Sequence, residues 1–135
     1  MKKSSSFVVL LLILFILMDF SYSQDSSLTN SKITSKDIEK NLIVGVETEN
    51  LGLKVSSAYY LGERKSSMAV IPLMNVLHTD NSEEARIIAA LSLYKIGDAR
   101  GIYAIRRSAE YDGSESVKRL CKIFYEMYLR EQKSK

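Results

Sequence analysis

Matching residues recur along this chain at intervals of 32 positions, and this internal repeat constrains the fold more than any other feature. Each copy opens with an apolar and a basic residue: Leu53-Lys54, Ala85-Arg86 and Val117-Lys118. A small residue follows four positions after the apolar one, and a large residue eight positions after it: Ser57 and Leu61, Ala89 and Leu93, Cys121 and Tyr125. We therefore expect repeated units that bury apolar residues by stacking on one another.

The second half of the unit repeats as well. Residues 69–73 (AVIPL) align with residues 101–105 (GIYAI), and Ile38 and Leu42 fill the matching places of an incomplete earlier copy. The apolar spacing is helical in each copy. In the third it is i, i+3, i+4, i+7 and i+11: Val117, Leu120, Cys121, Phe124 and Tyr128. Because this spacing places side chains on one face of a helix, the sequence predicts an all-α fold.

Capping and turn residues set the expected helix boundaries. Ser82 and Ser114 each precede acidic residues that favour a helix start, and Gly97-Asp98 and Asp112-Gly113 favour turns. These signals predict about six helices, at about 35–47, 51–62, 67–78, 82–95, 99–110 and 114–131. Pro72 falls inside the third of them, so that helix should either begin later or bend there.

Residues 85–102 (ARIIAALSLYKIGDARGI) resemble the HEAT-like repeat of the phycobilisome-lyase type. The shared pattern is an apolar residue with arginine, two alanines, a leucine-containing stretch, Gly-Asp-x-Arg and an apolar second helix. The resemblance covers about 38–128, is strongest over 85–105 and is weaker where Lys65-Ser66 replaces Gly-Asp. It implies a short α-solenoid of about three stacked helix pairs, with Asp98 and Arg100 paired at the repeat junction.

Residues 1–23 have the pattern of a signal peptide. Two lysines precede the apolar run Phe7–Met18, and Ser21-Tyr22-Ser23 predicts cleavage before Gln24. The run is shorter than the roughly 20 residues that span a bilayer, although an uncleaved anchor is the alternative. We expect a signal peptide at 1–23, a flexible lead-in at 24–33 and the solenoid domain at 34–135. The mature protein should then be exported, periplasmic or secreted, with no membrane attachment after cleavage.

Several kinds of chemistry are disfavoured by the residues present. Without Lys2, Lys3 and Asp19 the chain carries 17 basic and 15 acidic residues, which is too balanced to favour nucleic acid. His78 is the only histidine and has no converging ligands, so we expect no metal. Cys121 is the only cysteine, and its small, inward position predicts a buried inert thiol, although export leaves a reactive or intermolecular thiol open. We expect no enzyme activity and no cofactor.

The second helix of each pair supplies the candidate binding face. In helical solenoids these helices line the concave surface, where partners often bind. The 32-residue offset matches positions 71, 75 and 78 with 103, 107 and 110, and so predicts one shared surface: Ile71, Asn75, His78, Tyr103, Arg106, Arg107 and Glu110. We therefore expect an interaction module for a protein or peptide. The alternatives are a structural subunit that assembles through its repeat ends and, less favoured, a lyase-like HEAT repeat enzyme.

Overall fold

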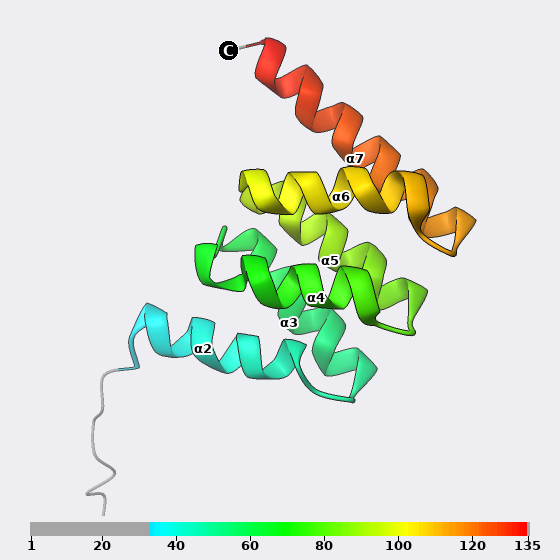
Figure 1. The fold of residues 1–135 in the computed structure, drawn as a ribbon. Helices are drawn as coiled ribbons and strands as arrows, with labels where there is room; N and C mark the ends of the chain where they lie inside the picture. Colours follow the sequence, from blue (N-terminus) through cyan, green and yellow to red (C-terminus); the bar gives the residue numbers. More distant parts are fainter. Residues whose placement is uncertain (1–32, 135) are drawn as a thin grey trace, which may run out of the picture. The chain divides into compact units, whose positions relative to one another are not determined.

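The computed structural model describes residues 33–134, and this part of the chain is all α-helical (Figure 1). Residues Ile33–Lys135 cluster into one compact unit. The proposed signal peptide and nearly all of the lead-in lie outside the described residues. The described part contains six α-helices: α2 (Ser35–Val46), α3 (Leu51–Glu63), α4 (Val70–Thr79), α5 (Glu83–Ile96), α6 (Ala99–Tyr111) and α7 (Glu115–Lys133). The predicted number of helices is confirmed, and all but one of the predicted boundaries agree within two residues.

The exception is the start of α4, which resolves the question raised by Pro72. Residues Ser67–Ala69 form a 3-10 turn, η2, and the α-helix begins only at Val70. Pro72 is then the third residue of α4. The first four N–H groups of an α-helix have no acceptor within the helix, so a proline there removes no helical hydrogen bond. The helix therefore begins later than the sequence pattern placed it.

Equivalent residues cap the first helix of each repeat. The side chains of Asn50, Ser82 and Ser114 each accept a hydrogen bond from the backbone N–H three residues ahead, at 2.9, 3.3 and 3.4 Å. Such caps satisfy amides that the helix itself leaves free. At the other end of α5, Gly97 adopts φ 74°, the left-handed conformation that favours glycine. The 32-residue period of the sequence thus extends to the helix starts.

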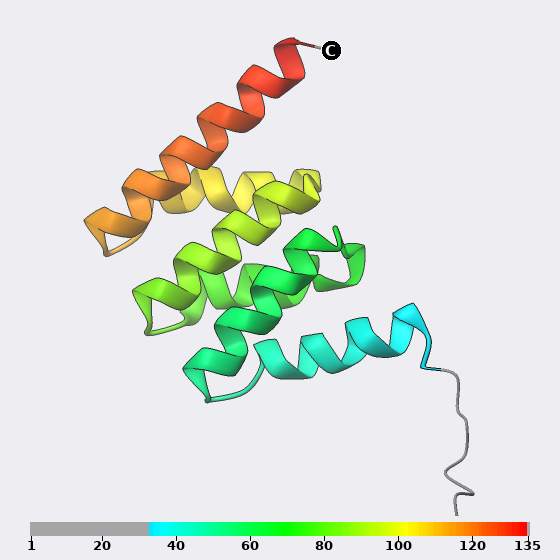
Figure 2. The same ribbon diagram turned by 180° about the vertical axis from the view of Figure 1, so that it is seen from behind.

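The helices lie in two rows. Helices α3, α5 and α7 pack in one row, and α2, α4 and α6 pack in the other (Figures 1 and 2). This arrangement is compatible with a helical-repeat solenoid. The core between the rows is formed by fully buried aliphatic side chains from four helices: Leu61, Leu73, Leu77, Leu93 and Ile105. The small repeat positions Ser57, Ala89 and Cys121 are also buried, and Ser57 of α3 lies against Gly45 of α2, so helices of the two rows approach closely there.

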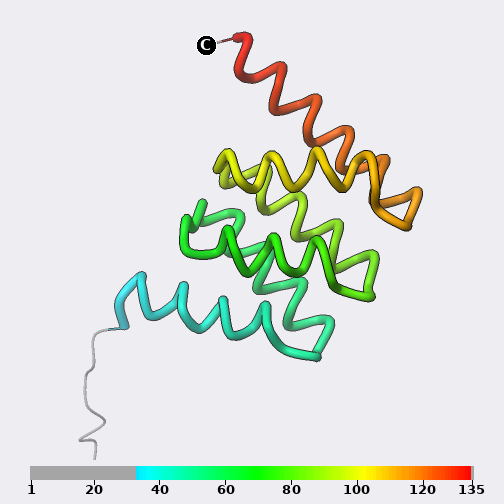
Figure 3. The backbone as a smooth tube through the Cα atoms, in the orientation of Figure 1, coloured from blue at the N-terminus to red at the C-terminus, as the bar shows by residue number. Residues whose placement is uncertain are grey.

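The last helix is longer than the others. The C-terminal turns of α7 extend past α5 and α6 (Figure 3), and every residue from Leu129 to Ser134 is exposed. None of the helices between residues 33 and 134 is both long enough and apolar enough to cross a membrane.

Candidate functional site

The seven residues of the predicted face are all exposed on α4 and α6. Three of them, His78, Tyr103 and Arg107, line a groove of about 550 Å³ between α4 and α6. Asn75 lines a neighbouring groove between α2 and α4. The remaining three line neither groove, and two of these, Arg106 and Glu110, form an ion pair at 3.6 Å along α6. The residues of the predicted face thus lie in two neighbouring grooves and on the helix surface beside them.

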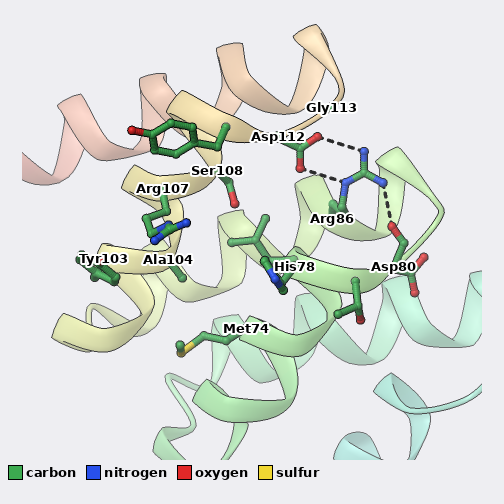
Figure 4. A pocket seen from close by; sticks show the side chains of 13 residues that line it. Met74, His78, Asp80, Arg86, Tyr103, Ala104, Arg107, Ser108, Asp112 and Gly113 are labelled. Carbon is green, nitrogen blue, oxygen red and sulfur yellow. Dashed lines mark hydrogen bonds and ion pairs between the residues drawn. The ribbon is translucent and has the colours of Figure 1, made fainter.

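The α4–α6 groove combines an apolar wall with polar ends (Figure 4). Met74, Leu77 and Ala104 supply apolar surface. Tyr103 and Tyr111 both line the groove and are 58% and 72% exposed, so their rings are available to a ligand. Apolar surface with a few polar groups is the usual composition of a binding groove.

One end of the groove is fixed by a bidentate ion pair that sequence reasoning missed. The Nε and Nη2 atoms of Arg86 donate to the carboxylate of Asp112, each at 3.1 Å, and Nη1 donates to the Asp80 carbonyl at 2.7 Å. The Asp112 carboxylate also accepts from the N–H of Ser114 at 2.8 Å. This arrangement ties α5 to the loops that follow α4 and α6, so the end of the groove is rigid.

An equivalent ion pair lies one repeat earlier. The Lys54 ammonium donates to the carboxylate of Asp80, which also accepts from the N–H of Ser82 at 2.8 Å. Lys54 and Asp80 are separated by 26 residues, as are Arg86 and Asp112. This recurring distance between a basic and an acidic residue is the signal by which both pairs could have been found from the sequence.

The pKa values of two groups in this part of the structure are shifted. Burial alone would raise the pKa of Asp80, but the hydrogen bond from Lys54, the Ser82 N–H and the charges of Lys54 and Arg86 outweigh it and hold that pKa below its usual value. Burial, with a smaller contribution from the Asp112 charge, raises the pKa of Cys121 to about 12. Cys121 is fully buried, which confirms its predicted inward position.

Arg107 differs from the other charged residues of the groove. Of the arginines and aspartates that line it, Arg107 alone has no ion-pair partner within residues 33–134. Its guanidinium carbon lies 5.5 Å from the centroid of the Tyr111 ring, within the range of a cation–π contact. The groove therefore presents an unneutralised, solvent-exposed cation beside the Tyr111 ring.

The α2–α4 groove occupies the equivalent place one repeat earlier but has different chemistry. Asn75 stands where the α4–α6 groove has Arg107, and Thr79 stands where it has Tyr111. Glu47 and Glu49 line this second groove as well. It offers an acidic lining with no free arginine, and so provides a natural control for the first.

Asp98 and Arg100 pair, as the resemblance implied, but they do so within the turn that joins the two helices of one repeat and not across a junction between repeats. The Nε and Nη2 atoms of Arg100 donate to the two carboxylate oxygens of Asp98, both at 3.0 Å. Asp98 also caps α6 by accepting from the Arg100 N–H at 2.9 Å. The hydrogen bond from the Arg100 side chain is the main cause that holds the pKa of Asp98 below its usual value. The pair has a structural role at the turn between α5 and α6.

Comparisons with known proteins add no family or relative. No family model matches the chain, and no curated protein matches it. The HEAT-like assignment therefore remains a prediction from the residues that carry it.

Among residues 33–134 no three side chains of the His, Cys, Asp or Glu type come together as they would around a metal ion.

Proposed function

We propose that this chain is a non-enzymatic binding module that holds a protein or peptide segment in the α4–α6 groove. The observation that carries the proposal is the guanidinium of Arg107, which has no ion-pair partner within residues 33–134 and lies beside the exposed Tyr111 ring in a groove that Tyr103 also lines. Arginine and tyrosine are enriched among residues that contribute most to binding energy at protein interfaces. The fixed loops at one end of the groove reduce the entropy that binding costs.

The lining also indicates the chemistry of the ligand. A carboxylate would accept hydrogen bonds from Arg107, whose guanidinium already lies beside the Tyr111 ring. A neighbouring apolar side chain would contact Met74 and the partly exposed Ala104. The groove therefore suits a peptide segment that carries an acidic residue next to an apolar one.

Selection from a displayed library of random peptides tests this proposal on the purified protein. We expect peptides with an acidic residue beside an apolar one to be enriched. The double variant R107E/Y103A should weaken binding of a selected peptide by at least about 30-fold, as expected for the loss of an important arginine contact. Isothermal titration calorimetry gives the two dissociation constants.

The α2–α4 groove supplies the matched control. The variant N75E/I71A changes the register-equivalent positions, of which Asn75 lines that groove; it also introduces a glutamate and removes an exposed side chain. It should leave the dissociation constant of the selected peptide within about twofold. Equal losses in the two variants, or selection of peptides without acidic residues, would contradict the proposal.

We also propose that the module acts outside the cytoplasm. The support is the leader pattern, with two lysines, the run Phe7–Met18 and the small residues before Gln24. N-terminal sequencing of protein from the exported fraction of expressing cells should begin at Gln24. Recovery only from the cytoplasmic fraction with Met1 intact would refute export.

A further inference from the structure

The two grooves on either side of α4 meet at the C-terminal end of that helix. Helix α4 lies between α2 and α6 in its row (Figure 1), and one groove runs along each of its sides. Thr79 and Asp80, where α4 ends, line both grooves. A ligand in the α4–α6 groove can therefore continue over this end of α4 into the α2–α4 groove and stay in contact with the protein.

The two grooves carry opposite uncompensated charges. Arg107 supplies the cation of the α4–α6 groove. In the α2–α4 groove Glu47 and Glu49 are exposed, and neither has an ion-pair partner within the described part of the chain. The other two charged residues of that groove, Lys54 and Asp80, form an ion pair with each other. The α2–α4 groove thus carries two negative charges that a basic side chain of a ligand would neutralise.

Exposed polar side chains lie between these two charged regions. Asn75 lines the α2–α4 groove and His78 lines the α4–α6 groove, and both are exposed on α4. The Thr79 hydroxyl donates to the backbone carbonyl of Asn75 at 2.9 Å, which leaves the Asn75 side chain free to bind a ligand. An asparagine amide both donates and accepts hydrogen bonds, so it can bind the N–H and C=O groups of a peptide backbone. The surface over α4 therefore suits an extended peptide.

We propose that the peptide segment held in the α4–α6 groove continues across α4 and places a basic side chain beside Glu47 and Glu49 in the α2–α4 groove. This inference rests on the proposed function of the α4–α6 groove and adds a second contact of opposite charge to it. The preferred ligand then carries an acidic residue that binds Arg107 and a basic residue that binds the two glutamates.

The spacing of the helices gives the expected spacing of the two ligand charges. Packed helices lie about 8–10 Å apart, so the centres of neighbouring grooves in one row are separated by about the same distance. An extended chain of the polyproline II type rises about 3.1 Å per residue and has about three residues per turn, so residues three positions apart lie on the same side, about 9 Å from each other. We therefore expect the acidic and basic residues to be three positions apart.

Isothermal titration calorimetry with matched peptides tests the inference. The reference is a peptide selected for the α4–α6 groove, trimmed to the shortest form that still binds and extended with alanines on both sides. Two further peptides carry lysine three positions before or after the acidic residue, and one of them should bind about fivefold more tightly than the reference, as expected for partly exposed ion pairs. Lysine one or five positions away should change the dissociation constant by less than about twofold.

Protein variants show whether this gain comes from the α2–α4 groove. E47Q/E49Q removes both negative charges at exposed positions, so it should abolish the gain from lysine and leave binding of the reference peptide within about twofold. E47K/E49K should reverse the preference, so that glutamate at the same peptide position binds more tightly than lysine. The matched control E126Q/E131Q removes two exposed carboxylates of α7 that line neither groove, and it should leave the gain unchanged.

Failure of this inference can be distinguished from failure of the proposed function. The reference peptide would bind through Arg107 in either case if the proposed function holds. A lysine that then adds nothing, adds equally at every position, or keeps its effect in E47Q/E49Q would overturn the crossing of α4 and leave the α4–α6 groove as the binding site. If no acidic peptide depends on Arg107, the proposed function is wrong and this inference fails with it.

Discussion

Arg86 binds more groups than any other side chain near the groove. Its guanidinium bonds both oxygens of the Asp112 carboxylate as well as the backbone carbonyls of Asp80 and Asn81. The Arg86 and Asp112 side chains are only 14% and 8% exposed, so water can replace little of this network. A lysine could not make these contacts together, because it lacks the planar fork of donors.

Replacement of Arg86 by methionine should therefore cost more than removal of an exposed ion pair. We expect Arg86→Met to lower the free energy of unfolding by about 3 kcal/mol, because the Asp112 carboxylate stays buried without its counter-charge. Arg100→Met removes a pair of similar geometry whose arginine is 58% exposed, and it should have little effect. Urea unfolding followed by circular dichroism measures both. Equal losses would mean that burial does not determine the strength of these pairs.

The Asp80 carboxylate should make stability depend on pH. The pKa of Asp80 is lowered in the folded protein, so ionised Asp80 favours the folded state above its unfolded pKa of about 3.9. This contribution is lost as the pH falls through the lower, folded value. Wild type should therefore be more stable than Asp80→Asn at pH 6, and the difference should shrink below about pH 4. A difference that stays constant between pH 6 and pH 3 would show that ionisation of Asp80 is not responsible.

At the scale of helices, the sequence predicted the features that depend on the spacing of nearby residues. Apolar periodicity and caps such as Ser82 and Ser114 gave the number of helices and nearly all of their ends. The start of α4 was placed too early because the 3-10 turn at Ser67–Ala69 continues the same apolar pattern. Which residues of the candidate face line the α4–α6 groove could not be read from the repeat register. Register shows which positions are equivalent, but only the packing of α2, α4 and α6 shows which side of each helix meets its neighbour.

The close approach of α3 to α5, two neighbouring helices of one row, depends on Gly62. A Cβ atom on Gly62 of α3 would lie 2.7 Å from the Cα of Ser92 on α5, so the two backbones would have to separate. Gly62→Ala should lower the free energy of unfolding by about 1–3 kcal/mol, the usual cost of overpacking, although alanine is the better helix former.

Gly52 in the same helix is the matched control for this prediction. The nearest atom to a Cβ at that position is the Asn50 side-chain oxygen at 3.6 Å, which is an ordinary contact. Gly52→Ala should therefore be neutral or stabilise the protein by up to about 1 kcal/mol. Thermal unfolding of the two variants compares them directly, and a similar change of the same sign in both would rule out helix approach as the cause.

At the scale of the whole molecule, the two ends of the stack are unlike. The N-terminal end exposes Leu53 and Tyr60, whereas the C-terminal end presents charges at Arg119, Lys122 and Glu126. Packing a further helix against the C-terminal end would desolvate these three charges, which is costly.

Hydrogen exchange should follow the position of each helix in the stack. In repeat-type packing each helix is stabilised mainly by its immediate neighbours, so helices with neighbours on both sides open least often. Helices α4 and α5 meet such neighbours, whereas α2 lies at one end and the last turns of α7 extend past the stack. We therefore expect the slowest exchange in α4 and α5 and the fastest in α2 and residues 129–134, measured by mass spectrometry. Uniform protection across all six described helices would show instead that this part of the chain opens as one cooperative unit.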